Sequence, residues 1–187
     1  MMKERLAKIK LLAMDVDGTL TEGEMIVLDG HQIKHFNVYD GLGTRLALNI
    51  GLGIAWITGN TSEAVSDRAK SLGVTDVYQG ARFKSDALND LALRHGLGMD
   101  EIAYIGDDLN DLPAFERAGV AIAVANAPEE VKARADMVTE RGGGHGAVRE
   151  VIEAVLKARG EWEAAIEGYL DELRREQDGK AGPEAVA

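Results

Sequence analysis

Two aspartates, Asp15 and Asp17, stand one residue apart directly after a largely apolar run, Ile9 to Met14. The run predicts a buried strand, so both acids leave the strand on the same side, about one pleat repeat apart. Two carboxylates this close repel each other unless a cation lies between them. In line with a phosphate neutralised by Mg²⁺, Asp15 is a candidate nucleophile that forms an aspartyl-phosphate. Asp17 is then the candidate acid and, later, base.

The next two residues suit the same chemistry. Gly18 allows the chain to leave the strand in a conformation that most residues disfavour. Thr19 offers a hydroxyl and a backbone N–H to the departing group. A second apolar run, 53–57, ends in Thr58 and Gly59, where a hydroxyl and free N–H groups could hold phosphate oxygens.

A third apolar run, Ile102 to Ile105, ends in a cluster of carboxylates that suits a hard cation with oxygen ligands. The predicted metal ligands are Asp15, Asp17 and Asp107. Asp108 and Asp111 are predicted to orient a ligand, a water or Lys84, because crowding every carboxylate around one Mg²⁺ would overcompensate its charge. Lys84 opens an amphipathic run that ends at His95, and taken alone it would be an ordinary surface lysine.

The segment Asp-Val-Asp-Gly-Thr resembles the first motif of the haloacid dehalogenase superfamily, and the second Asp is typical of its phosphatases. In that resemblance Lys84 anchors the phosphate. The chain is most similar to the capless family of 3-deoxy-D-manno-octulosonate 8-phosphate (KDO 8-phosphate) phosphatases over residues 8–155. This similarity is carried by Phe36-Asn37-Val38-x-Asp40-Gly41, Ile57-Thr58-Gly59, Tyr78-Gln79-Gly80, Ala103 to Asp111 and Gly143-Gly144-x-Gly146-Ala147-Val148-Arg149-Glu150.

The resemblance implies a cytoplasmic, Mg²⁺-dependent phosphatase of a small phosphorylated sugar acid, and a homotetramer whose hairpins assemble between subunits. It predicts substrate contacts from Thr19, Gly59, Asn60, Tyr39 and Arg149. At the position of Tyr39 the family usually has arginine. At the position of Asn60 it usually has arginine, or glutamate in the relatives that act on nine-carbon substrates. Arginine binds carboxylates with a bidentate fork that Tyr and Asn cannot imitate. Two alternatives therefore stay open: a nine-carbon keto-sugar acid 9-phosphate or another phosphate ester as substrate, and a non-catalytic accessory subunit.

Apolar and amphipathic segments alternate along the chain, which predicts a three-layer α/β/α Rossmann-like parallel sheet with ligands beyond the carboxyl ends of its strands. The expected helices cover 41–49, 62–72, 83–95, 113–118, 128–135 and 147–158. One segment, about 24–37, breaks the alternation and predicts a β-hairpin with an Asp-Gly turn. The segment 58–84 is too short for a cap domain. The glycine-rich run 142–146 is either a flexible loop or part of the site mouth.

The composition of the 187 residues fits one α/β domain, predicted as 1–160, followed by an amphipathic helix at 161–176 and a disordered tail at 177–187. A net charge of −11 argues against binding to nucleic-acid backbones. The absence of cysteine excludes disulfides and thiolate chemistry. A charged start and the lack of an apolar run of about 18 residues predict no signal peptide and no membrane span.

Overall fold

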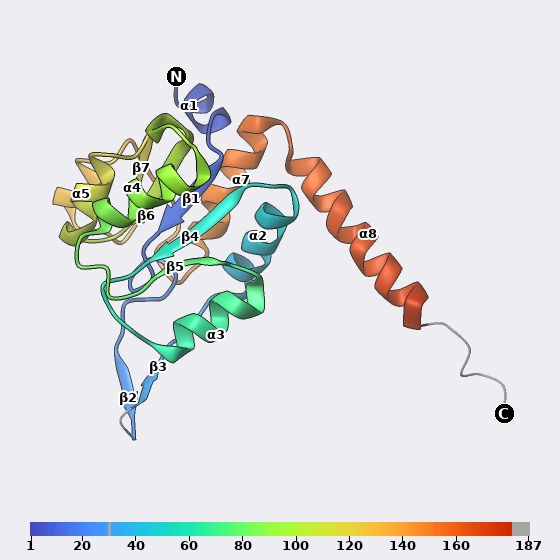
Figure 1. Ribbon diagram of the computed structural model, residues 1–187, viewed down its shortest axis with the longest axis horizontal. Coiled ribbons are helices and arrows are strands. Elements are labelled where there is room, and N and C mark those ends of the chain that lie inside the picture. The colour runs from blue at the N-terminus through green and yellow to red at the C-terminus, as the bar shows by residue number, and fades with distance from the viewer. Residues whose placement is uncertain (30, 181–187) are drawn as a thin grey trace.

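The computed structural model describes residues 1–29 and 31–180, and a six-stranded parallel sheet forms its centre (Figure 1). The strands lie in the order β5-β4-β1-β6-β7-β8. Their bounds are β1 Leu11–Met14, β4 Gly53–Ile57, β5 Asp76–Tyr78, β6 Ile102–Gly106, β7 Val120–Ala123 and β8 Met137–Val138. Strand β1 is buried along its whole length because helices cover both faces of the sheet, which explains its apolar run.

The helices form the two outer layers, as the alternation predicted. They are α1 Met2–Ala7, α2 Val38–Asn49, α3 Glu63–Leu72, α4 Lys84–His95, α5 Leu112–Phe115, α6 Glu129–Lys132, α7 Ala147–Arg159 and α8 Trp162–Lys180. Helices α1, α2, α3 and α7 pack together on one face, and α4 and α5 pack together on the other (Figure 1). Two 3₁₀ turns, Met99–Glu101 and Leu109–Asp111, flank β6.

The register of the sheet brings three strand ends together. Met14, the last residue of β1, pairs with Trp56 of β4 on one side and with Ile105 of β6 on the other. The loops that follow these three strands therefore open at the same edge of the sheet. Between β4 and α4 the chain forms only α3 and β5, so no cap domain covers that edge.

The predicted hairpin exists and is shorter than expected. Strands β2 (Ile26–Leu28) and β3 (His31–Ile33) pair antiparallel in a sheet of their own, which projects from the body (Figure 1). Asp29 has a φ of 50°, the left-handed conformation that the Asp-Gly turn requires. Gly30 lies outside the described residues.

Some helix bounds differ from the prediction. Helix α2 starts at Val38 rather than Gly41, because the Asn37 side chain accepts a hydrogen bond from the Tyr39 N–H at 2.8 Å and caps it. Helix α1 was not predicted. It is held by a two-bond ion pair, in which each terminal nitrogen of Arg5 lies 2.7 Å from an Asp136 oxygen.

Helix α8 continues to Lys180 and leaves the body after its first turns (Figure 1). It therefore includes residues 177–180, which the sequence assigned to a disordered tail; residues 181–187 lie outside the described part. Its start packs on α7, and Glu172 accepts bonds from Arg45 and Asn49 of α2. Across the described residues, no helix is both long and apolar enough to cross a bilayer.

Candidate active site

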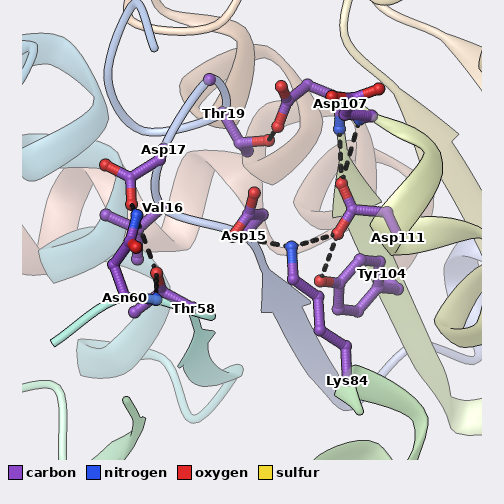
Figure 2. Close-up of polar contacts among 12 residues, drawn as sticks. Asp15, Val16, Asp17, Thr19, Thr58, Asn60, Lys84, Tyr104, Asp107 and Asp111 are labelled. Atoms are coloured by element: carbon purple, nitrogen blue, oxygen red, sulfur yellow. Dashed lines mark hydrogen bonds and ion pairs between the residues drawn. The ribbon is translucent and has the colours of Figure 1, made fainter. Parts of the chain in front are cut away.

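The predicted acids gather where β1 and β6 end, and Lys84 reaches them from the first turn of α4 (Figure 2). The Lys84 ammonium lies 2.9 Å from Asp15 Oδ1 and 2.6 Å from Asp111 Oδ1. Its side chain is 2 % exposed. Burial lowers the pKa of Lys84, but the two carboxylates outweigh burial and raise it above its usual value. Lys84 is therefore a fixed positive charge beside the candidate nucleophile.

Asp111 holds this arrangement together. Its Oδ1 accepts hydrogen bonds from Lys84 and from the Tyr104 hydroxyl, the latter at 2.8 Å. Its Oδ2 accepts from the backbone N–H groups of Asp107 and Asp108 at 2.9 and 3.2 Å. Both oxygens are thus already occupied, and they fix the lysine and the turn after β6 (Figure 2).

Asp107 faces Asp15 across the site. The Thr19 hydroxyl donates to Asp107 Oδ1 at 3.1 Å. Gly18, with a φ of 97°, lies so close that a Cβ there would stand 2.0 Å from Asp107 Oδ2. Only glycine therefore lets the two loops approach this closely. Asp108 is exposed and instead caps the 3₁₀ turn by accepting from the Leu109 N–H at 2.7 Å.

The carboxylates fit a divalent cation. Asp15, Asp107 and Asp111 each offer an oxygen within 4.8 Å of the others. Burial, followed by repulsion from Asp111, raises the pKa of Asp15 to about 6. Burial, followed by repulsion from Asp15 and Asp111, raises the pKa of Asp107 to about 8. One lysine does not compensate two buried carboxylates and the half-buried Asp107, and a set of oxygen donors is what Mg²⁺ prefers.

Because both Asp111 oxygens are occupied by donors of the protein, Asp15 and Asp107 are the carboxylates with free oxygens for the ion. The carboxylate of Asp17 is not in the group that the described residues form around Asp15. Its predicted part in metal binding stays a prediction.

Asp17 points away from Asp15, toward the loop after β4 (Figure 2). Its Oδ1 accepts a hydrogen bond from Lys34 of the hairpin. Its Oδ2 accepts from Asn60 Nδ2 at 2.9 Å and from the Thr58 hydroxyl at 3.3 Å. Burial raises the pKa of Asp17, but these three donors outweigh burial and hold the pKa below its usual value. The carboxylate is therefore stabilised in its ionised form.

The other predicted substrate contacts are spread more widely. Thr58, Gly59 and Asn60 follow β4 at the same edge as the acids. Tyr39 is exposed at the start of α2. The Arg149 guanidinium lies over the Trp162 ring, 5.1 Å from its centroid, and its Nε donates to Glu153 at 2.9 Å. Its role in substrate binding stays a prediction, and these contacts give its side chain another explanation.

The glycine-rich loop 142–146 packs tightly on the site. Gly144 N–H donates to the Thr19 carbonyl at 3.0 Å, and Gly143 N–H donates to Asn126 Oδ1 at 2.8 Å. A Cβ on Gly143 would stand 1.6 Å from the Gly18 carbonyl oxygen. The loop thus supports the turn that carries Asp17 and Thr19. The sequence alone left two roles open for this loop, namely a flexible loop or part of the site mouth.

Sequence reasoning missed Lys34 and Tyr104. Lys34 alternates with Ile33 and His35 along the returning strand, so a period of two was a usable signal for an inward side chain. Tyr104 reads as one more apolar residue of β6. A tyrosine that is completely buried needs an acceptor for its hydroxyl, and burial with the nearby Asp111 carboxylate raises its pKa well above the usual value, so it stays a donor.

Comparison with known proteins identifies the family of the chain. A family model of haloacid dehalogenase-like hydrolases matches residues 54–152, more than half of the chain. The chain belongs to this family. The chain is also similar to 3-deoxy-D-manno-octulosonate 8-phosphate phosphatase of Escherichia coli K12, with 43 % identity over 158 residues, or 84 % of each chain.

Solved structures of the family agree with the fold. The structure of a haloacid dehalogenase superfamily hydrolase from Legionella pneumophila matches with a TM-score of 0.88 and 43 % identity, over 90 % of this chain and 93 % of that one. The 3-deoxy-D-manno-octulosonate 8-phosphate phosphatase of Moraxella catarrhalis, in complex with magnesium, phosphate and KDO, matches with a TM-score of 0.86 and 43 % identity. This second match covers 89 % of this chain and 97 % of that one.

Proposed function

We propose that the chain is a Mg²⁺-dependent phosphatase that hydrolyses KDO 8-phosphate to KDO and phosphate through an aspartyl-phosphate. The observation that carries the proposal is the contact of Lys84 with Asp15 and Asp111 beside Asp107. It places a carboxylate with a free oxygen among the charges that a phosphate group needs. The relatives from Escherichia coli and Moraxella catarrhalis support the substrate by their own activity.

The chemistry runs in two displacements. A carboxylate oxygen of Asp15 attacks phosphorus, the bond from phosphorus to the sugar oxygen breaks, and Asp17 gives that oxygen a proton. Water then attacks phosphorus of the aspartyl-phosphate, its proton passes to Asp17, and phosphate leaves with Asp15 restored. Mg²⁺ held by Asp15 and Asp107 supplies the positive charge that neutralises the phosphate.

The remaining residues bind and orient. Lys84 and Thr58 contact the phosphate oxygens, together with the backbone N–H groups near Thr19, Gly59 and Asn60. Asp111 orients Lys84, and Asp108 shapes the turn after β6. Tyr39 and Arg149 are proposed at the substrate's sugar end, and a cytoplasmic homotetramer is the proposed working form.

A second candidate substrate is a nine-carbon keto-sugar acid 9-phosphate. It stays open because Asn60 is neither the arginine usual at this position in the family nor the glutamate of the nine-carbon relatives, and its amide donates to Asp17 at 2.9 Å. A non-catalytic accessory role is disfavoured, since Asp15, Asp17, Thr58 and Lys84 are all present and in contact through the bonds described above.

The test is a panel of sugar phosphates assayed with and without Mg²⁺. We expect the highest kcat/KM for KDO 8-phosphate and loss of turnover when the metal is chelated. A higher kcat/KM for the nine-carbon ester would replace the proposed substrate. Absence of turnover with every ester would favour the accessory role.

The nucleophile is tested with Asp15→Asn. An amide does not attack phosphorus, so turnover should fall by at least about 10³-fold while the unfolding transition is retained. Thermal unfolding and far-UV circular dichroism control for the fold. Residual activity within about tenfold of the wild type would contradict the assignment.

A further inference from the structure

The glycine-rich loop 142–146 packs against the turn after β1 and has little rigidity of its own. Its three consecutive glycines, Gly142 to Gly144, restrict the backbone less than any other residues would. The structure nevertheless holds Gly144 at a φ of 72°, so close to the turn that a Cβ there would stand 2.6 Å from the Glu22 backbone nitrogen. Bonds from outside the loop must therefore hold it in this position.

Two asparagines bond the glycines in opposite senses. Asn126 Oδ1 accepts a hydrogen bond from the Gly143 N–H at 2.8 Å. Asn37 Nδ2 donates a hydrogen bond to the Gly144 carbonyl at 3.0 Å. Gly144 in turn donates its own N–H to the Thr19 carbonyl at 3.0 Å. A single glycine therefore lies between the Asn37 side chain and the turn after β1.

Asn37 is itself held on both sides along the chain. Phe36, the residue before it, stacks on Trp56 of β4 with ring centroids 6.0 Å apart and planes inclined by 14°. Helix α2 begins directly after it, and Asn37 Oδ1 caps this helix by accepting the Tyr39 N–H at 2.8 Å. Because the oxygen serves the cap, the amide nitrogen is the atom that faces Gly144. Asn37 thus joins α2 to the loop with one acceptor atom and one donor atom.

The first turn of α2 also holds the far end of the loop. Gly146 is the N-cap of α7 and has no side chain with which to bond the helix. The Asp40 carboxylate takes that place from α2 and accepts the Arg149 N–H at 2.7 Å. Helix α2 therefore carries the loop at two points, and Asn37 holds the point that contacts the turn after β1.

A displacement of the loop would reach the reaction through this turn. The turn carries Asp17, and its Thr19 hydroxyl donates to Asp107 Oδ1 at 3.1 Å (Figure 2). Loop and turn are in backbone contact, since a Cβ on Gly143 would stand 1.6 Å from the Gly18 carbonyl oxygen. Because a small misplacement of a catalytic group costs much of the rate, the bond that holds the loop can affect turnover from a distance.

We propose that Asn37 is a positioning residue that holds the turn after β1 in place through Gly144. The inference rests on the proposed function, in which this turn presents Asp17 and Thr19 to the reacting phosphate. Asn37 contacts no reacting atom, and its effect passes through the loop. The group that matters is the amide N–H, which a carboxylate at the same position lacks.

Asn37→Asp separates the two bonds of the side chain. Asp caps a helix as well as Asn does, so the midpoint of thermal unfolding should stay within about 4 °C of the wild type. The donor is lost, and a carboxylate oxygen would face the Gly144 carbonyl. Amide hydrogen exchange, measured by mass spectrometry, should become at least about fivefold faster in peptides covering 16–22 and 142–146 and stay unchanged in α2.

The same variant should lose turnover. We expect kcat for KDO 8-phosphate and for p-nitrophenyl phosphate each to fall at least about fivefold, because the turn serves the phosphate that both esters share. KM should change by less than about threefold, since Lys84 and Thr58, which are proposed to contact the phosphate oxygens, lie outside the turn. A general defect of the fold would instead lower the unfolding midpoint and speed exchange throughout the sheet.

Asn126→Asp is the matched control. It adds the same charge beside the same loop, but Asn126 bonds Gly143 with an oxygen, which an aspartate keeps. Its exchange rates and kcat should stay within about twofold of the wild type. Asn37→Ser removes the donor without adding a charge. Serine still caps a helix, and its hydroxyl lies one bond closer to the backbone than the amide nitrogen, so this variant should behave as Asn37→Asp does.

Three results would overturn the inference. Wild-type exchange rates at 16–22 in Asn37→Asp would mean that Asn37 does not hold the turn. Faster exchange with unchanged kcat would mean that the bond does not position the reacting groups. Equal losses in Asn126→Asp, with none in Asn37→Ser, would mean that the added charge is the cause.

The proposed function fails in a different way. A wild type that cleaves p-nitrophenyl phosphate but not KDO 8-phosphate contradicts the proposed substrate alone, and p-nitrophenyl phosphate then carries the kinetic test. A wild type that cleaves neither ester contradicts the proposed function. The exchange rates at 16–22 still decide in that case whether Asn37 holds the turn.

Discussion

At the scale of single residues, Asp111 and Asp107 are both carboxylates, but Asp111 stabilises the fold of the site whereas Asp107 is repelled by its neighbours. Asp111 is completely buried and accepts four hydrogen bonds, including those from Lys84 and Tyr104. Asp107 accepts one hydrogen bond, from Thr19. Burial is the largest cause that raises the pKa of Asp107 to about 8, and repulsion from neighbouring carboxylates is the next. Removing Asp111 therefore leaves donors without partners, whereas removing Asp107 relieves repulsion.

Asp111→Ala should lower the free energy of unfolding by about 3 kcal/mol, the scale for breaking a buried ion pair. Mg²⁺ affinity should fall roughly 10- to 100-fold, because Asp111 orients the ligands and does not supply a free oxygen. Urea unfolding without metal gives the first quantity, and isothermal titration with Mg²⁺ gives the second. Asp111→Asn keeps the shape of the side chain and should lose less stability.

Asp107→Ala should show the reverse pattern. Mg²⁺ binding should become undetectable at millimolar metal, and the metal-free protein should unfold at the same or a higher urea concentration than the wild type. If Asp107→Ala instead destabilised the apoprotein while keeping Mg²⁺ affinity, the assigned roles of the two acids would be exchanged.

Asp40 offers a prediction on pH. It is buried in α2, where it accepts the Arg149 N–H at 2.7 Å, and burial raises its pKa to about 6 against partly compensating bonds from α7. A carboxyl whose pKa is higher in the folded than in the unfolded chain, where it is about 3.9, holds its proton more tightly when folded. Its contribution to stability is therefore greatest at low pH and is lost as pH rises from about 4 to about 6.

Asp40→Asn does not ionise, so this loss should be absent from the variant. The difference in unfolding free energy, variant minus wild type, should increase between pH 4 and pH 6.5 and then level off. Other buried acids titrate in both proteins and cancel in that difference. A difference that stays constant with pH would show that Asp40 keeps an ordinary pKa in the fold.

The acids of the site could be predicted because parallel strands present their carboxyl ends at one edge, and apolar runs mark those ends in the sequence. The contacts of Lys34 and Tyr104 could not be predicted by the same argument. The contact of Lys34 depends on the direction in which the hairpin leaves the body, which no local pattern encodes. The contact of Tyr104 depends on Asp111 turning back over β6, which the 3₁₀ turn after that strand produces.

At the scale of elements, the glycine-rich loop 142–146 acts as a support for the turn after β1. It reaches Thr19 through the Gly144 N–H, and the Asn37 amide donates to the Gly144 carbonyl at 3.0 Å. The loop thereby connects the turn that carries Asp17 to the residue that caps α2. Displacement of this loop should therefore shift the position of Asp17 without a direct contact to its side chain.

Gly143→Ala should test that connection, because the added methyl would stand 1.6 Å from the Gly18 carbonyl oxygen, which is backbone and must shift. We expect a loss of at least about 1–3 kcal/mol of stability. Turnover at a temperature where the variant is folded should fall by at least about tenfold, since a small misplacement of a catalytic group is costly. Gly168→Ala in α8 is the control: nothing lies within 4 Å of its Cβ position. It should leave activity intact.

Element bounds show what local patterns can and cannot predict. Strands β1, β4 and β6 follow the apolar runs 9–14, 53–57 and 102–105 because helices cover both faces of the sheet there. Helix α1 has only six residues, and the helical spacing of its Met2 and Leu6 is too short a pattern to decide the assignment alone. It forms because it packs on α7 and because Arg5 pairs with Asp136, contacts that span the whole sequence.

At the scale of the whole molecule, two parts extend from the body: helix α8 and the hairpin (Figure 1). The hairpin exposes Met25, Val27 and Leu28 at 65, 59 and 60 %. A two-stranded hairpin is marginal in water by itself, and gathered exposed apolar side chains favour association with a partner. The edge of the sheet that carries the acids also has no cap domain over it. One arrangement meets both needs, namely neighbouring subunits that bury the hairpins and cover the sites.

Val27→Asp should dissociate the proposed tetramer, because a charge placed in a packed apolar interface is not compensated there. The monomer should keep its fold, since Val27 is exposed in it. Analytical ultracentrifugation at micromolar concentration should show the change of mass. Turnover of KDO 8-phosphate should fall more than turnover of p-nitrophenyl phosphate, which needs less positioning. Leu93→Asp, at an exposed leucine of α4 outside the hairpin, is the matched control and should stay tetrameric. A wild type that sediments as a monomer at this concentration and still selects KDO 8-phosphate would show that the hairpins serve another purpose.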